Sequence, residues 1–174
     1  MIQLNTDLNI VLREMNDSDA ESIAKHANNK KIFDNLRDFF PYPYTVQDAL
    51  KFIEGCNKQI QKTVFGISVN DEIAGTIGCG IFKDVSRMTA EMGYWIGEAY
   101  WGKGIVSKCI EVFTNYMFSN FNIIRIQAPV FEFNNPSMRV LEKNGFYLES
   151  VMKQSAIKNE KIIDMLLYVK LKEK

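Results

Sequence analysis

The sequence has 174 residues, and its 21 lysines and arginines balance its 21 aspartates and glutamates, so the formal net charge is zero. A content of 47% apolar and 12% aromatic residues argues against a disordered chain, and the charge balance gives no sign of nucleic acid or an anionic membrane as a partner. The length suits one domain over residues 1–174 with a sizeable core.

The three cysteines, Cys56, Cys79 and Cys109, are an odd number without C-x-x-C spacing. This pattern is typical of buried thiols in a reducing compartment rather than of disulfides or metal ligands, and no metal site is predicted. We find no secretory h-region at the N-terminus and no apolar run of membrane-spanning length. We therefore expect a cytoplasmic protein without a membrane partner.

The first third of the chain predicts one strand followed by three helices. The strand signal is the polar–apolar alternation of residues 8–15. The helices are expected over residues 20–28, 31–39 and 45–61. Thr45 and Asp48 form a variant of the capping box at the start of the third helix. Pro41 and Pro43 push their preceding residues toward extended geometry, so the stretch between the second and third helices is not helical.

The remainder predicts strands and helices in alternation. The strands are expected over residues 62–69, 72–82, 88–96, 123–127, 146–156 and 161–171. A long helix begins at Ile105, and a shorter one follows Asn134 or Asn135 and ends at about Asn144, before Gly145 at the position of a helix C′ residue. This order of elements predicts an α/β domain with a mixed sheet.

The most informative stretch covers residues 91–117. It begins as an apolar strand, turns through the sequence YWGKG at residues 100–104 and continues as a helix at Ile105. Two glycines before a helix leave the backbone N–H groups of the first turn uncovered by side chains, and these donors lack intrahelical partners. Together with the helix macrodipole they favour an anion such as phosphate. The stretch matches neither the full P-loop pattern nor a dinucleotide fingerprint, which has a glycine where Ser107 stands.

Two segments, YWIGEAYWGKGIVSKCIEVF and NNPSMRVLEKNGF, resemble the GNAT superfamily of N-acetyltransferases. The resemblance covers nearly the whole chain and is strongest to the RimJ/RimL branch, which acetylates ribosomal-protein N-termini. In the family, the pattern [QR]-x-x-G-x-[GA] wraps the pyrophosphate of acetyl-CoA. Gly102 and Gly104 match it, whereas Ala99 replaces the [QR] residue. The resemblance implies a mixed, mostly antiparallel sheet of about seven strands with about four or five flanking helices.

The same resemblance implies acetyl-CoA as the co-substrate. Its phosphates are expected on the backbone N–H groups of Trp101, Gly102, Lys103, Gly104, Ile105 and Val106. The strand end formed by Trp95, Ile96 and Gly97 is expected to splay from its neighbour and to bind the pantetheine arm and the thioester carbonyl, as it does in the family. Lys103 either adds positive charge to the phosphate site or is merely solvated.

Glu91 is the candidate general base. It shares a strand face with Gly93 and Trp95, and a carboxylate on a largely buried strand is costly unless it is paired or useful. Two roles stay open. Glu91 either takes a proton from the acceptor ammonium, directly or through a water, or forms a structural salt bridge with Arg87 or Arg125.

The candidate acid is less clear from the residues alone. Many GNAT enzymes use a tyrosine on the helix that follows the N-x-x-[AS] motif, and Leu141 occupies that position here. The resemblance offers Ser137 instead, near the coenzyme sulfur, where it either protonates the thiolate or donates a hydrogen bond to it. The alternative is that Ser137 only supports the first helical turn. Asn134 binds the pantetheine, caps the helix, or does both.

Three residues fall where the family's substrate groove forms, namely Arg37, Tyr42 and Tyr44. Arg37 either binds a substrate carboxylate or faces water, and the tyrosines either line the groove or pack in the core. His26 and Cys109 are interpreted as structural.

By resemblance, the chain is an N-acetyltransferase that transfers acetyl directly to a primary amine, and a protein N-terminal α-amine is the favoured acceptor. We expect a monomer or a homodimer. The alternatives are an acetyltransferase for small amines, amino acids or antibiotics, a non-catalytic sensor that binds the coenzyme, and a nucleotide-binding protein that uses the glycine turn.

Overall fold

The computed structural model describes residues 3–5 and 10–173. Within them the strands are β1 (Gln3–Asn5), β2 (Ile10–Arg13), β3 (Val64–Val69), β4 (Glu72–Ile81), β5 (Thr89–Ile96), β6 (Arg125–Phe131), β7 (Tyr147–Lys158) and β8 (Lys161–Leu171). The α-helices are α1 (Ala20–Ala27), α2 (Lys30–Phe33), α3 (Val46–Asn57), α4 (Ile105–Asn120) and α5 (Asn135–Lys143).

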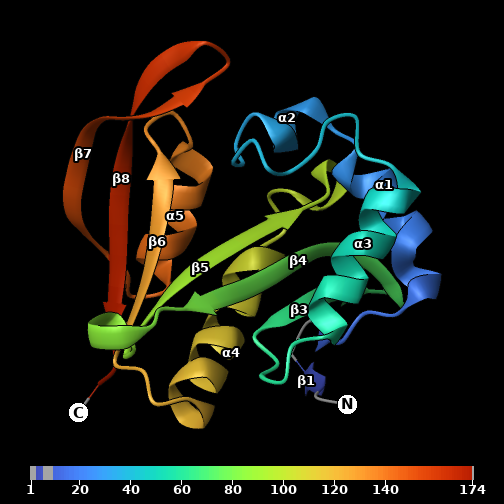
Figure 1. Cartoon of the computed structure of the whole chain (residues 1–174), viewed down its shortest axis with the longest axis horizontal. Helices are drawn as coiled ribbons and strands as arrows, with labels where there is room; N and C mark the ends of the chain where they lie inside the picture. Colours follow the sequence, from blue (N-terminus) through green and yellow to red (C-terminus); the bar gives the residue numbers. More distant parts are fainter. Residues whose placement is uncertain (1–2, 6–9, 174) are drawn as a thin grey trace.

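The eight strands of this described part form one sheet in the order β1-β2-β3-β4-β5-β6-β8-β7 (Figure 1). Neighbouring strands are antiparallel except β5 and β6, which run parallel. This is the mixed, mostly antiparallel sheet that the sequence predicts. About seven strands are expected, and the additional strand is the short β1.

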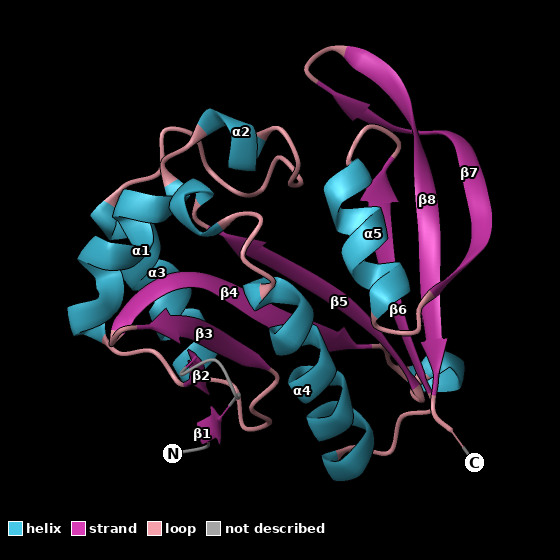
Figure 2. Cartoon of the chain, turned by 180° about the vertical axis from the view of Figure 1, so that it is seen from behind, coloured by secondary structure: helices cyan, strands magenta, loops and turns pink. Residues whose placement is uncertain are grey.

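Helices cover both faces of the sheet, with α1 and α3 on one face and α4 and α5 on the other (Figures 1 and 2). Alternation along β5 assigns its side chains to two separate cores. Met92 and Ile96 are buried with side chains of α4 and α5, whereas Trp95 packs against the cluster formed by α1 and α3. A site built on β5 can therefore have side chains on both faces of the sheet.

β5 and β6 are paired over only three residues of each strand, and the last rung joins Glu91 to Gln127. Beyond it, β5 continues with β4, and β6 continues with β8. Pro129 marks the divergence. The Arg125 N–H donates to the Met88 carbonyl on the β5 side, so alternation places the Pro129 nitrogen on that same side, where the β5 ladder has already ended. The predicted splay is thus present, and a proline is tolerated inside β6 because of it.

The second and third helices are shorter than predicted. α2 ends at Phe33 rather than at residue 39, because the backbone then changes to i→i−3 bonds and the Asn35 side chain donates to the Lys31 carbonyl. α3 ends at Asn57 rather than at residue 61, and Ile60, which is 99% exposed, shows that no apolar face continues to be buried there.

The strand boundaries also differ from the predictions. β6 runs on to Phe131 rather than ending at residue 127, and β7 reaches Lys158 rather than residue 156. Of the first predicted strand, residues 8–9 lie outside the described residues, and the part from Ile10 forms β2.

Candidate active site at the splayed strands

A cavity of about 1420 Å³ opens where β5 and β6 diverge. It is bordered by β5, β6, the start of α4, the start of α5 and the segment that follows α2. This volume exceeds that of typical small-ligand pockets, about 300–1,000 Å³, so it suits a long ligand or two ligands together.

The turn before α4 has the backbone that an anion site requires. Gly102 and Gly104 have φ values of 72° and 76°, and Gly104 is the N-cap of α4 without a side-chain cap bond. A Cβ built on either glycine meets nothing within 4 Å, so both face open space. The Trp101 indole N–H donates to the Ile96 carbonyl at 2.8 Å, which fixes the turn against β5. The first turn of α4 thus borders the cavity, whereas the Trp101 N–H, also predicted to bind phosphate, already donates to the Glu98 carbonyl.

Other predicted backbone contacts are only partly available. The Gly97 N–H already donates to the Ala74 carbonyl at 2.8 Å, and Trp95 faces β4 in register with Thr76. By alternation, the main-chain groups of Met92, Tyr94 and Ile96 point into the gap, and the Ile96 carbonyl already accepts from the Trp101 indole. The edge that faces the gap therefore includes Ile96 of the predicted segment and extends toward the middle of β5.

Lys103 is placed over a ring rather than in the cavity wall. Its Nζ lies 5.6 Å from the centroid of the Tyr100 ring. The first turn of α4 gains a different polar contact, because the Asn144 side chain donates to Ser107 Oγ at 3.0 Å. This bond joins the end of α5 to the start of α4.

The N-terminus of α5 carries the second polar group of the cavity. The Asn134 side chain caps the helix by accepting the Ser137 N–H at 3.2 Å. Ser137 Oγ lies 2.7 Å from the Tyr94 hydroxyl of β5. Burial raises the pKa of Tyr94 to about 12, although its hydrogen bond with Ser137 acts in the opposite direction. Ser137 therefore faces a phenol that stays protonated at any physiological pH.

Glu91 does form a salt bridge, but with a residue that sequence reasoning did not pair with it. Its Oε1 lies 2.5 Å from Nη2 of Arg37, and its Oε2 accepts from the Gln127 amide at 3.2 Å. The expected partners are occupied elsewhere. Arg87 donates to the Asp84 carbonyl, and Arg125 binds Glu149 through both guanidinium nitrogens. The Glu91 carboxylate and the Arg37 guanidinium, predicted for separate roles, thus meet at one place.

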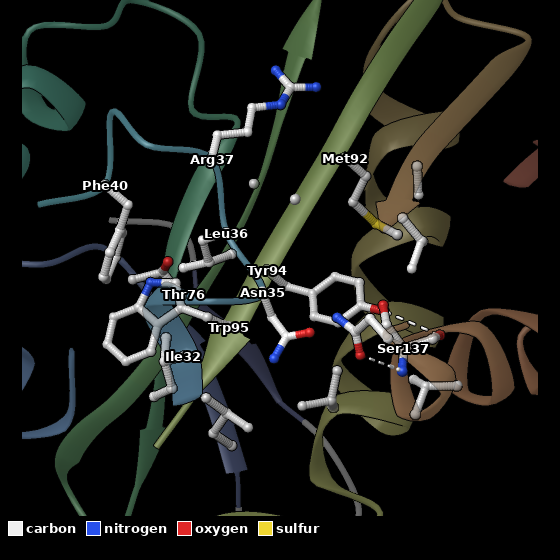
Figure 3. A pocket seen from close by; sticks show the side chains of 18 of the residues that line it. Ile32, Asn35, Leu36, Arg37, Phe40, Thr76, Met92, Tyr94, Trp95 and Ser137 are labelled. Carbon is white, nitrogen blue, oxygen red and sulfur yellow. Dashed lines mark hydrogen bonds between the residues drawn. The ribbon is translucent and has the colours of Figure 1, made fainter. Parts of the chain in front are cut away.

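Glu91 and Ser137 lie on opposite sides of β5. Figure 3 shows Arg37, Phe40 and Trp95 on one side of the strand and Met92, Tyr94 and Ser137 on the other. Because the strand has lost its β6 partner at this level, the two sides belong to the same cavity. The arrangement can bring together a ligand held on the α4 and α5 side and a second one beside Glu91.

The predicted substrate tyrosines differ in position. Tyr44 is 6% exposed, packs against the Phe40 ring at 4.9 Å between centroids and belongs to the core under α1 and α3. Burial raises its pKa to about 12. Tyr42 is 44% exposed and stacks on the Phe33 ring at 5.4 Å between centroids. Tyr44 is thus a core residue that also borders the cavity, whereas Tyr42 does not border it.

A contact between distant segments lies beside the cavity, next to its lining residue Arg37. Lys158, at the end of β7, is 2% exposed, and its Nζ lies 2.7 Å from Asp38 and 3.6 Å from the centroid of the Phe33 ring. Asn159 donates to Asp34 at 3.0 Å. The β7–β8 hairpin thus bonds to the segment after α2 at the top of the molecule in Figure 1.

The remaining predictions for single residues are straightforward. The three cysteines are free and buried, and burial raises the pKa of Cys109 to about 12, so this thiol is a core group as predicted. His26 lies with Nε2 3.0 Å from Glu72 and its ring edge-on to Tyr100. The described residues contain no group of three or more side chains suited to a metal ion, and no described helix is long and apolar enough to cross a membrane.

Sequence reasoning missed Tyr94 and Gln127 as polar neighbours of Ser137 and Glu91. The alternation along β5 places Tyr94 on the side of Met92, but its distance to Ser137 depends on how α5 docks. Gln127 is recognisable only once the parallel register of β5 and β6 is known. Both are tertiary contacts, so no local sequence pattern predicts them.

A glycine-bounded helix start on one side of a splayed strand, with an acidic residue on the other side, suits a transferase that brings a phosphate-bearing donor and a separate acceptor together. The family model for the acetyltransferase (GNAT) domain matches residues 9–147. The chain belongs to this family and is an N-acetyltransferase.

Relatives within the family agree with this assignment. The chain is 31% identical over 160 residues to the [Ribosomal protein uS5]-alanine N-acetyltransferase of Escherichia coli, covering 87% of this chain and 81% of that one. The structure of RimL, a ribosomal L7/L12 alpha-N-protein acetyltransferase in complex with coenzyme A, superposes with a TM-score of 0.87 at 22% identity, covering 98% of both chains. The microcin C7 self-immunity acetyltransferase MccE, in complex with acetyl-CoA and AMP, has a TM-score of 0.82 at 26% identity, covering 96% and 94%. These likenesses confirm the predicted fold.

Proposed function

We propose that this N-acetyltransferase uses acetyl-CoA as donor and transfers the acetyl group directly to the α-amine of a protein N-terminus. The observation that carries the proposal is the continuity of the cavity. It extends from the bare helix start at Gly104, past the Tyr94–Ser137 pair, to Glu91 and Arg37 on the other side of β5. A donor and an acceptor can therefore meet at the unpaired part of this strand.

The residues of the donor side fit a diphosphate and a pantetheine arm. The N–H groups of Gly102 to Val106 provide donors and the positive end of the α4 dipole, and the two glycines leave room for close approach. Met92 and Tyr94 offer main-chain groups to an extended amide-containing chain, as a neighbouring strand would. Bound acetyl-CoA supplies an activated thioester at the end of this path.

On the acceptor side, Glu91 accepts the proton that the ammonium must lose before nitrogen attacks, directly or through a water. Arg37 and Gln127 hold the two carboxylate oxygens, so the group is oriented before the acceptor arrives. Ser137, fixed by the Asn134 cap, donates a hydrogen bond to the sulfur as negative charge develops there. Arg37 also remains 52% exposed and can contact a carbonyl or carboxylate of the acceptor.

The ribosomal-protein acceptors named for two relatives support a peptide substrate. One observation favours the small-amine alternative. The Lys158–Asp38 contact ties the segment that carries Arg37 to the β7–β8 hairpin, and a fixed wall beside Arg37 suits a small molecule better than the surface of a folded protein. A flexible N-terminal segment, by contrast, can enter as an extended chain.

We expect mass spectrometry to decide between these acceptors. Ribosomal proteins incubated with the enzyme and acetyl-CoA are predicted to gain one acetyl group on an N-terminal residue, faster than any of a panel of free amines and amino acids. Reactions without enzyme serve as the control. Faster acetylation of a free amine would replace the protein acceptor with a small one, and coenzyme binding without thiol release from any acceptor would support the sensor alternative.

A further inference from the structure

The Tyr94–Ser137 contact joins two hydroxyl groups, either of which can donate. The Tyr94 hydroxyl lies 2.7 Å from Ser137 Oγ and 3.5 Å from the Ser137 backbone carbonyl. A phenol has one hydrogen to donate, and the longer contact is at the limit of hydrogen bonding. Because burial keeps the phenol protonated, its hydrogen is available for the short contact with Ser137 Oγ.

When Tyr94 donates to Ser137 Oγ, the hydrogen of the Ser137 hydroxyl can bond to another acceptor. The backbone of Ser137 is fixed by the Asn134 cap, and the side chain borders the cavity. A hydroxyl that accepts a hydrogen bond is polarised and becomes a better donor to the next acceptor in line. The phenol thus both orients the serine hydroxyl and strengthens it.

We propose that Tyr94 is a positioning residue that directs the Ser137 hydroxyl toward the sulfur of the departing thiolate. This inference rests on the proposed function. As the bond between the acetyl carbon and nitrogen forms, the carbon–sulfur bond breaks and its electron pair stays on sulfur. The Ser137 hydroxyl donates a hydrogen bond to that sulfur, and Tyr94 keeps its own proton throughout. The proton that completes the free thiol comes from the acceptor amine through solvent.

A double-mutant cycle tests the inference on the full-length enzyme with acetyl-CoA. We expect Tyr94→Phe to lower kcat by about tenfold and Ser137→Ala by about a hundredfold, both within the usual range for groups that assist proton movement. The double variant is expected to match Ser137→Ala alone, because the phenol acts only through the serine. The Kd for coenzyme A, measured by calorimetry, should stay within about twofold in all three, which also checks folding.

Tyr116→Phe is the matched control. Tyr116 lies on α4, and its phenol donates to the Lys62 carbonyl. It should leave kcat unchanged. If the losses from Tyr94→Phe and Ser137→Ala multiply in the double variant, Tyr94 acts independently of the serine and the inference is wrong. An unchanged kcat for Tyr94→Phe also overturns it while the proposed role of Ser137 stands. Full activity of Ser137→Ala would remove both.

Discussion

Replacing Gly104 by glutamate is expected to raise the Kd for acetyl-CoA by at least about a hundredfold, effectively abolishing coenzyme binding. Gly104 has a φ of 76°, a conformation that costs a non-glycine residue roughly 1–2 kcal/mol. The space beside it is open, so the new carboxylate would extend into the site proposed for the diphosphate. There it would compete for the N–H donors of α4 and repel the phosphates. Titration calorimetry with acetyl-CoA measures the loss.

Gly145→Glu is the control for backbone strain. Gly145 has a φ of 78° and follows the end of α5, outside the cavity wall. A Cβ built on it meets only the Lys170 side chain, at 3.9 Å. In a thermal melt this variant should lose as much stability as Gly104→Glu does, but it should still bind the coenzyme. Retained affinity in Gly104→Glu would show that the phosphates lie elsewhere.

The second large effect is expected for Glu91→Gln, which should lower kcat by about 10²- to 10³-fold with little change in coenzyme affinity. The amide keeps the shape and a hydrogen-bond acceptor for Arg37 but does not accept a proton from the ammonium. Initial rates of thiol release across a pH series provide the measurement.

Glu149→Gln provides the matched control, because Glu149 is also a strand carboxylate paired with an arginine, Arg125, but it does not line the cavity. Its kcat should be that of the wild type. Equal rates for Glu91→Gln and the wild type across pH would leave Glu91 with a structural role in its ion pair with Arg37.

Features set by neighbouring residues were predictable from the sequence. The Thr45–Asp48 capping box and the Asn134 cap are present, and the turn before α4 has positive φ at Gly102 and Gly104. Each depends on backbone chemistry within one helical turn, so residue type and spacing are sufficient.

Contacts between distant residues were not predictable in the same way. Glu91 lies 54 residues from Arg37, and Lys158 lies 120 residues from Asp38. Sequence reasoning identified Glu91 as a carboxylate that needs a partner. It did not identify the correct arginine, because the sequence does not show which segments lie beside β5. Asp34, directly after α2, likewise accepts from Asn159 of the hairpin, 125 residues away.

Titration of the unmodified protein with acetyl-CoA in a calorimeter tests the central claim, that the exposed amides at the start of α4 bind a coenzyme diphosphate. We predict saturable heat that fits one site, and weaker or undetectable heat with ATP or NAD at the same concentrations. Absence of heat with both acetyl-CoA and coenzyme A, in a sample that melts cooperatively, would contradict the account.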